Sequence, residues 1–202
     1  MKSTSFPDQA KHEIQAVQGE ATKDKTYTSE QTFPDEASAI AAFDRSVAKL
    51  LTINGWSGLS LFTADFFLHD ATGQPNTSGP PQVGDYIQIR LPGPMPENWV
   101  RVTHVAREEN RVEFTVHPSR DPREEQSEAI QHFFQAQASS TFRVERIGTT
   151  IRASEIGHDE AINNKGSQAG DRAMINTAIA EMGWLFYQKL QWKLLTDYLV
   201  HL

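Results

Sequence analysis

The sequence predicts an α+β domain in which an antiparallel sheet is closed by one long C-terminal helix. Three observations lead to this fold class. Runs of β-forming residues alternate with turn residues through the middle of the chain. Two pairs of these runs are separated by so few residues that they are expected to pair as antiparallel hairpins. Residues 172–202 contain no proline and carry apolar residues at helical spacing.

The N-terminal part is expected to contain one strand and one helix. Residues 1–11 are polar and predict a loose arm, whereas 12–202 has the length of one domain, for which ~100–200 residues is usual. A first strand is expected within 12–33, whose end is rich in β-formers. Apolar residues at helical spacing then predict a helix over 37–51, with Asp35 as its N-cap.

The middle of the chain is expected to form strands joined by turns. Segment 59–69 is apolar but alternates poorly, so either both of its faces are buried or part of it is not a strand. Glycine and proline in 70–81 predict a loop long enough to form a rim or lid. In 86–91, Ile87 and Ile89 share one face and Gln88 lies on the other.

Two hairpins and two helices complete the predicted order. Strand 99–106 is expected to pair with 112–116, and 141–147 with 149–156 across Gly148. Between the hairpins, 123–138 favours a helix with Phe133 and Phe134 on its apolar edge. The final helix, 172–202, would be roughly 45 Å long at 1.5 Å per residue.

This order resembles that of the START/Bet v 1-like superfamily, also called helix-grip or SRPBCC. The resemblance is carried by helix 37–51, hairpins 97–117 and 141–156, and helix 172–202. It implies a curved antiparallel sheet wrapped around the C-terminal helix, with an internal cavity between them. The helical segment 123–138 departs from the pattern.

Three phrases also resemble an uncharacterised bacterial branch of the DUF1990 type: Gly84-Asp85-Tyr86-Ile87, Val100-Arg101-Val102-Thr103-His104-Val105 and Phe142-Arg143-Val144-Glu145-Arg146.

Composition excludes several classes of function. The chain has no cysteine, which excludes disulfides, thiolate metal sites and a cysteine nucleophile. With 19 basic against 26 acidic residues and a net charge of −7, we expect no nucleic-acid partner. No apolar run is long enough for a membrane span, and the N-terminus lacks a signal peptide, so a cytoplasmic location is expected.

The candidate catalytic residues are His104, Glu155 and His158. A carboxylate beside an imidazole raises its basicity and can form an acid–base pair. The alternative for Glu155 and His158 is an ordinary solvated loop before a helix. The seven histidines show no spacing suited to a zinc site, so neither a metal nor a cofactor is predicted.

The candidate ligand-binding residues fall into a basic and an aromatic group. If their strand faces line a cavity, Arg101, Arg143 and Arg152 could hold an anionic group; if they face solvent, they form cross-strand ion pairs. The aromatic side chains could wall an apolar pocket or be ordinary core, and those chosen are Trp99, Phe114 and Trp184.

Three functions fit these observations. The leading hypothesis is a domain that binds a small apolar or amphipathic ligand between sheet and C-terminal helix. The alternatives are an enzyme of the cyclase or hydrolase type, and an interaction protein that docks through its last helix. Polar and aromatic residues lie off the helix's apolar stripe and would face a partner, which suggests a homodimer; they are Trp184, Tyr187, Gln188, Gln191 and Trp192.

Overall fold

The computed structural model describes residues 23–93, 95, 97–124, 129–161, 163 and 184–202. The predicted arm 1–11, the strand candidates in 12–22 and helix residues 172–183 lie outside this part of the chain. The described elements run in the following order: β1 (Lys23–Thr32), α2 (Glu36–Leu51), the 3₁₀ helix η1 (Ile53–Trp56), β2 (Asp65–His69), β3 (Tyr86–Arg90), β4 (Asn98–Glu108), β5 (Arg111–Pro118), β6 (Ser139–Ile147), β7 (Thr150–Glu160) and α4 (Trp184–Leu199).

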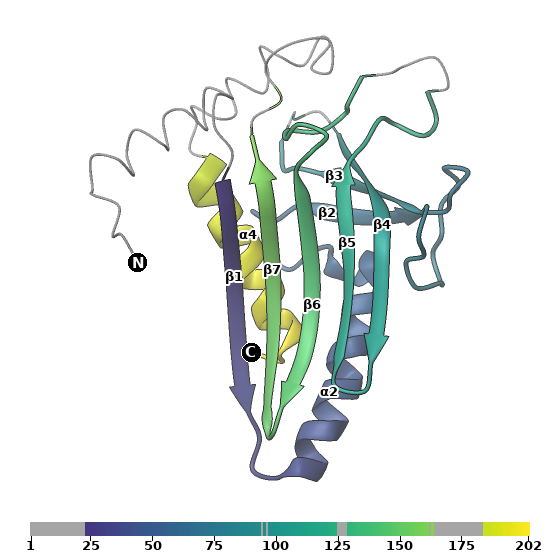
Figure 1. Ribbon diagram of the computed structural model, residues 1–202. Coiled ribbons are helices and arrows are strands. Elements are labelled where there is room, and N and C mark those ends of the chain that lie inside the picture. The colour runs from purple at the N-terminus through teal and green to yellow at the C-terminus, as the bar shows by residue number, and fades with distance from the viewer. Residues whose placement is uncertain (1–22, 94, 96, 125–128, 162, 164–183) are drawn as a thin grey trace.

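The seven strands form one antiparallel sheet in the order β1-β7-β6-β5-β4-β3-β2. Figure 1 shows β1, β7, β6 and β5 running up and down the view while β2 runs across it, so the sheet is strongly curved. Helices α2 and α4 lie together on one side of the sheet, with α4 behind β1 and β7. The predicted fold class, a curved antiparallel sheet around the C-terminal helix with a helix after the first strand, is confirmed.

Local sequence explains most element boundaries. The carboxylate of Asp35 accepts a hydrogen bond from the backbone N–H of Ser38 at 2.7 Å, which caps α2 as predicted. Strands β6 and β7 are joined by a two-residue turn in which Gly148 has a φ of 61°. Glycine adopts this left-handed conformation without strain, which suits a tight hairpin.

The segment before β2 is only partly a strand, which decides between the two alternatives for 59–69. Strand β2 begins at Asp65, because Ser60 and Thr63 close a turn upstream: the Ser60 N–H donates to the Thr63 hydroxyl at 3.0 Å. Leu61 and Phe62 consequently point outward, with 91% and 67% of their surface exposed.

The predicted helix 123–138 is wrong for the described residues of that segment. Two backbone N–H groups bond to the residues that directly follow β5 and β7 instead of to a preceding helical turn: that of Gln131 donates to Ser119 O and that of Gln135 to Ala161 O, both at 2.9 Å. The side-chain amide of Asn163 also donates to the carbonyls of Ile130 and His132. Tertiary hydrogen bonds therefore override the helix propensity of this stretch.

The apolar core lies between the sheet and the helices. Its centre is Trp56, whose ring contacts those of Phe66, Phe114 and Phe142 at centroid distances of 5.0–5.8 Å. Its indole N–H donates to Lys49 O at 3.0 Å, so the polar tip of this buried side chain is satisfied. The described helices include none long and apolar enough to cross a membrane.

Candidate functional site: a cavity beneath the N-terminal half of α4

A cavity of about 60 Å³ lies between the sheet and α4, room for a few water molecules. Strand β3 contributes Ile87 and Ile89 to it, which confirms that these two share an inward face. The remaining described lining comes from β2, β4, β5 and β6, from η1, from the segment after β5, from residues next to the strands and from α4: Trp56, Ala64, Phe66, Leu91, Asn98, Val100, Val116, Pro118, His132, Phe133, Phe134, Ala138, Ser139, Ser140, Phe142, Tyr187, Gln188, Gln191 and Trp192.

The wall is mainly apolar and aromatic, and its polar groups come from α4 and, across the cavity lining, from Asn98, His132, Ser139 and Ser140. Among the described lining residues there is neither lysine nor arginine. Gln188 and Gln191, one helical turn apart, are 2% and 3% exposed. An apolar wall with a few convergent polar groups is the usual character of a site for a small molecule.

The buried face of α4 differs from the predicted one. Gln188, Gln191, Leu195 and Leu199 are buried, whereas Leu190 and Leu194 of the predicted stripe are only half-buried. The sequence predicts that the two glutamines face a partner, whereas in the structure they are buried toward the sheet. The reason for expecting a homodimer therefore does not hold for the described residues.

Beside the cavity lies a buried polar cluster built on β1, β7 and α4. Gln188 lines the cavity and links it to this cluster, because its amide N–H donates to Glu160 Oε1 at 2.8 Å and its oxygen accepts from Lys25 Nζ at 3.1 Å. Glu155 lies opposite Tyr27 of β1 on one side and opposite Phe142 of β6 on the other.

Glu155 is the most unusual residue of the cluster. Its side chain is fully buried, and neither carboxyl oxygen has a hydrogen-bonding partner among the residues that the structure describes. Burial raises the pKa of Glu155 well above its ordinary value, and the neighbouring charge of Glu160 raises it further; Ser140 and Lys25 oppose this only in part. Burial and the same two glutamates raise the pKa of Tyr27 to about 12.

The predicted acid–base residues are not brought together. Glu155 faces the helices, whereas His158 is largely exposed and lies 3.5 Å from Asp24. His104 is exposed on β4, and β5 and β6 separate that strand from β7. Three strand spacings of ~4.8 Å place the backbones of these strands about 14 Å apart. Of the three candidates, only Glu155 lies next to the cavity.

The predicted ligand-binding residues lie outside the described cavity lining. Arg143 pairs with Glu113 at 2.5 Å, and Arg152 pairs with Glu30 at 2.6 Å. These are the cross-strand ion pairs that were the alternative reading. Phe114 is fully buried in the core against Trp56. The side chain of Trp184 lies outside the described part.

Trp99 and Arg101 belong to the other face of the sheet. Arg101 stacks over Tyr86, with its guanidinium carbon 5.6 Å from the ring centroid. Trp99 is buried there between Arg123, 4.7 Å from its ring centroid, and His69, whose ring centroid lies 4.9 Å away. The segment after β5 covers this tryptophan. The backbone N–H of Trp99 donates to Gln131 O, and the carbonyl of Trp99 accepts a hydrogen bond from the backbone N–H of Ser119.

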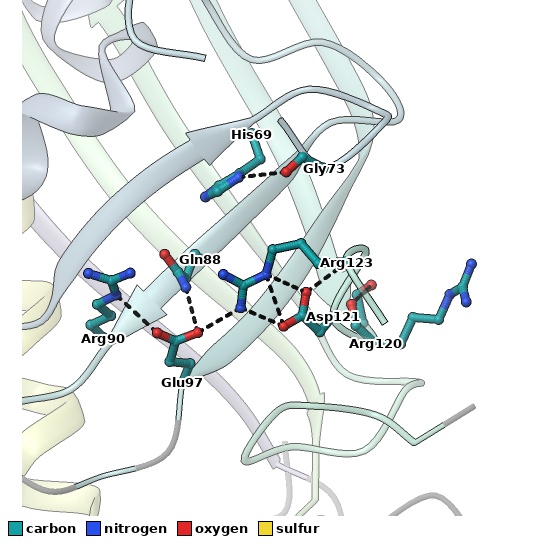
Figure 2. A network of polar contacts seen from close by, with 9 residues as sticks. His69, Gly73, Gln88, Arg90, Glu97, Arg120, Asp121 and Arg123 are labelled. Carbon is teal, nitrogen blue, oxygen red and sulfur yellow. Dashed lines mark hydrogen bonds and ion pairs between the residues drawn. The ribbon is translucent and has the colours of Figure 1, made fainter. Parts of the chain in front are cut away.

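A closed polar network holds that segment in place (Figure 2). Arg123 binds both carboxyl oxygens of Asp121, at 2.6 and 2.9 Å, and reaches Glu97 at 3.0 Å. Glu97 also binds Gln88 and Arg90. Burial would raise the pKa of Asp121, but the hydrogen bonds and charge of Arg123 outweigh it and hold that pKa below its usual range. Because these charges balance one another, we assign the network a structural role.

Arg123→Leu is expected to lower the free energy of unfolding by ~1–3 kcal/mol, because it leaves the buried Asp121 carboxylate unpaired and uncovers Trp99. Urea denaturation followed by circular dichroism measures this. Arg107→Leu, at an exposed position of β4, is the matched control and should change stability by less than ~0.5 kcal/mol. Equal losses from both substitutions would contradict the role given to the network.

Sequence reasoning missed several lining residues. The predicted helix 123–138 includes Phe133 and Phe134, and Ser140 lies just before the predicted strand 141–147, whereas β6 begins at Ser139. One signal was present: Gln188, Gln191, Leu195 and Leu199 follow the i, i+3, i+7 and i+11 spacing of a single helix face. Two glutamines at the start of an otherwise apolar face indicate a polar end to whatever that face covers.

No protein family profile matches this sequence, and no curated protein matches it. The resemblance to the DUF1990-type branch therefore stays a prediction. A hypothetical protein, jhp0584 from Helicobacter pylori, has a similar solved structure, with a TM-score of 0.51 and 10% identity over 98% of this chain and 96% of that chain. At this identity, the likeness shows the fold alone.

Two plant proteins are less similar in structure. Major latex-like protein 151 from Panax ginseng has a TM-score of 0.38 and 10% identity, over 82% of this chain and 97% of its own. Norcoclaurine synthase from Thalictrum flavum has a TM-score of 0.36 and 13% identity, over 91% of this chain and 94% of its own. Neither likeness carries an argument about function.

Proposed function

We propose that this protein binds a small, mostly apolar ligand in the cavity between the sheet and α4. The observation that supports this most is the composition of the wall: mostly aromatic and aliphatic side chains surround the space, with a small number of polar groups among them. A close-packed core leaves few voids larger than one water molecule, whereas this space of about 60 Å³ has room for several.

The two alternatives have less support. An enzyme would need a second acid–base group near Glu155, and His104 and His158 do not provide it. An interaction protein docking through α4 would need an apolar outer face. In the described part of α4, the most buried residues face the sheet, and the exposed ones include Lys189 and Lys193.

Binding is tested with p-xylene, a neutral probe of one aromatic ring. Added to ¹⁵N-labelled protein, it is expected to shift the amide resonances of Ala64, Ile89 and Phe142, which line the cavity, with a measurable dissociation constant. Native mass spectrometry and organic extraction of the purified protein then identify any ligand that it retains. No shift at millimolar p-xylene would overturn the proposal.

A matched pair of substitutions locates the binding. Ala138→Leu adds a larger side chain at a lining position that is 2% exposed, and is expected to weaken p-xylene binding at least fivefold by filling the cavity. Ala37→Leu makes the same change at an exposed position of α2 and should leave the affinity unchanged. Equal affinities for the two variants would place the probe elsewhere.

A further inference from the structure

Two residues of the cavity wall carry hydrogen-bond donors that nothing in the described structure satisfies. The amide Nε2 of Gln191 and the indole Nε1 of Trp192 are both buried, and neither has an acceptor among the described residues. Both residues line the cavity. A buried donor left without a partner costs ~1–3 kcal/mol, so two side by side on one helix call for an explanation.

The orientation of the Gln191 amide is fixed by its surroundings. Its Oε1 accepts the backbone N–H of Ala64 at 2.7 Å and lies 3.4 Å from the hydroxyl of Tyr187. Turning the amide over would set two donors, Nε2 and the Ala64 N–H, against each other. The free group at Gln191 is therefore a donor, and Ala64 also belongs to the cavity wall.

Trp192 presents the second donor from an aromatic setting. Its ring meets that of Phe142 edge to face, with centroids 5.4 Å apart, and lies 6.3 Å from that of Phe66. These contacts hold the indole beside the cavity, and its N–H has no acceptor among the described residues. A ligand that offers an oxygen acceptor would satisfy both donors and leave its apolar body among the aromatic rings.

The charges near the cavity indicate that this acceptor is uncharged. The described lining contains neither lysine nor arginine to neutralise an anion. Two acidic groups, Glu155 and Glu160, are buried beside it, against one half-buried basic group, Lys25; Gln188 binds both Glu160 and Lys25. A carboxylate or phosphate would be desolvated there next to two acidic groups, which is costly without a paired cation.

We propose that the ligand is a neutral aromatic carbonyl compound whose oxygen accepts hydrogen bonds from the side chains of Gln191 and Trp192. This inference rests on the proposed function and adds the chemical class of the ligand. The carbonyl is chosen because it accepts two hydrogen bonds and donates none, matching two donors. A hydroxyl would bring a donor of its own.

The test compares acetophenone with α-methylstyrene, which has nearly the same shape but a CH₂ group in place of the oxygen. Dissociation constants for both are measured by NMR titration on the full chain, and their ratio is taken for each variant, which cancels the difference in hydration of the two probes. Trp192→Phe keeps an aromatic ring and removes the N–H; Gln191→Met keeps the length and removes the amide. Each substitution is expected to weaken acetophenone binding about tenfold more than α-methylstyrene binding, which is the effect of one lost hydrogen bond.

Controls separate this inference from the proposed function. Gln82→Leu removes an exposed glutamine far from the cavity lining, so its ratio should equal that of the wild type. Benzoate is expected to bind at least tenfold more weakly than acetophenone. The Trp192 indole proton should move downfield on adding acetophenone and stay in place with α-methylstyrene, a readout that remains available if Gln191→Met fails to fold.

Each outcome decides something. If both probes bind and the ratio is the same in wild type, Trp192→Phe and Gln191→Met, the two donors serve cavity water and the inference is overturned while the proposed function stands. Benzoate binding as tightly as acetophenone would overturn the assignment of a neutral ligand. If neither probe binds at millimolar concentration, the proposed function fails, and the inference fails with it.

Discussion

Replacing Trp56 by alanine is expected to lower the free energy of unfolding by ~3–5 kcal/mol, a large part of the ~5–15 kcal/mol that stabilises a typical domain. Trp56 is fully buried and contacts three further aromatic rings, those of Phe66, Phe114 and Phe142. Alanine would remove those contacts and leave a void that the sheet and helices can close only partly. Urea denaturation measured by near- and far-ultraviolet circular dichroism gives the loss.

Two companion variants make this prediction specific. Trp56→Phe keeps a ring and removes the hydrogen bond to Lys49 O, so it should cost less than the alanine variant. Phe62→Ala deletes a large aromatic side chain that is 67% exposed, and it should change stability by less than ~0.5 kcal/mol. A Trp56→Ala variant within about 1 kcal/mol of the wild type would show that this cluster is not the centre of the core.

The order of strands and helices was predictable because each element leaves a local pattern. Asp35 before a helical run, Gly148 between two β-forming runs, and the alternation around Ile87 each depend on residues close together in the chain. Such patterns depend on local conformation and on burial of one face, and the structure shows both at these three places. The curved sheet then follows from hairpins that could pair in few other ways.

The site was harder to predict because it depends on contacts between distant segments. Asn163 and Ser119 determine the path of 129–135, and nothing within that stretch shows that its N–H groups bond elsewhere. Around Trp99 the sheet is also covered on its outer face, by the segment after β5. Trp99 and Ile87 are therefore both buried, although only Ile87 reaches the cavity, so a rule that places one face inward cannot tell them apart.

The prediction of Glu155 as a site residue was based on its spacing to His158 and not on its burial. Glu155 lies three residues before His158, but a strand places the two on opposite faces. What makes Glu155 unusual is its complete burial next to Glu160, which only the packing of β7 against α4 reveals. A glutamate within a strand of otherwise small or apolar inward residues, Ile151 and Ala153, was the available signal.

Glu155→Gln is expected to remove a pH dependence of stability. Because burial raises the pKa of Glu155 in the folded chain above the ordinary value of 4.5, the folded protein holds a proton that the unfolded chain releases. The stability that this proton contributes is fully present below pH 4.5 and declines as the pH rises toward the folded-state pKa. Glutamine has almost the same shape and never ionises, so the variant should not show that decline.

The difference between the two proteins should therefore grow with pH. Near pH 4, their free energies of unfolding should agree closely, and at pH 8 Glu155→Gln should be the more stable by ~1–3 kcal/mol, the range for a buried polar group without partners. Urea denaturation at pH 4, 6 and 8 measures this, with Glu109→Gln at an exposed turn as the control. Lys25, Tyr27 and Glu160 face position 155 in both proteins, so the part of their titration that does not depend on the charge of Glu155 is common to both. Parallel stability curves for wild type and Glu155→Gln would mean that Glu155 is ionised in the fold, and a cation or a ligand donor would then have to sit beside it.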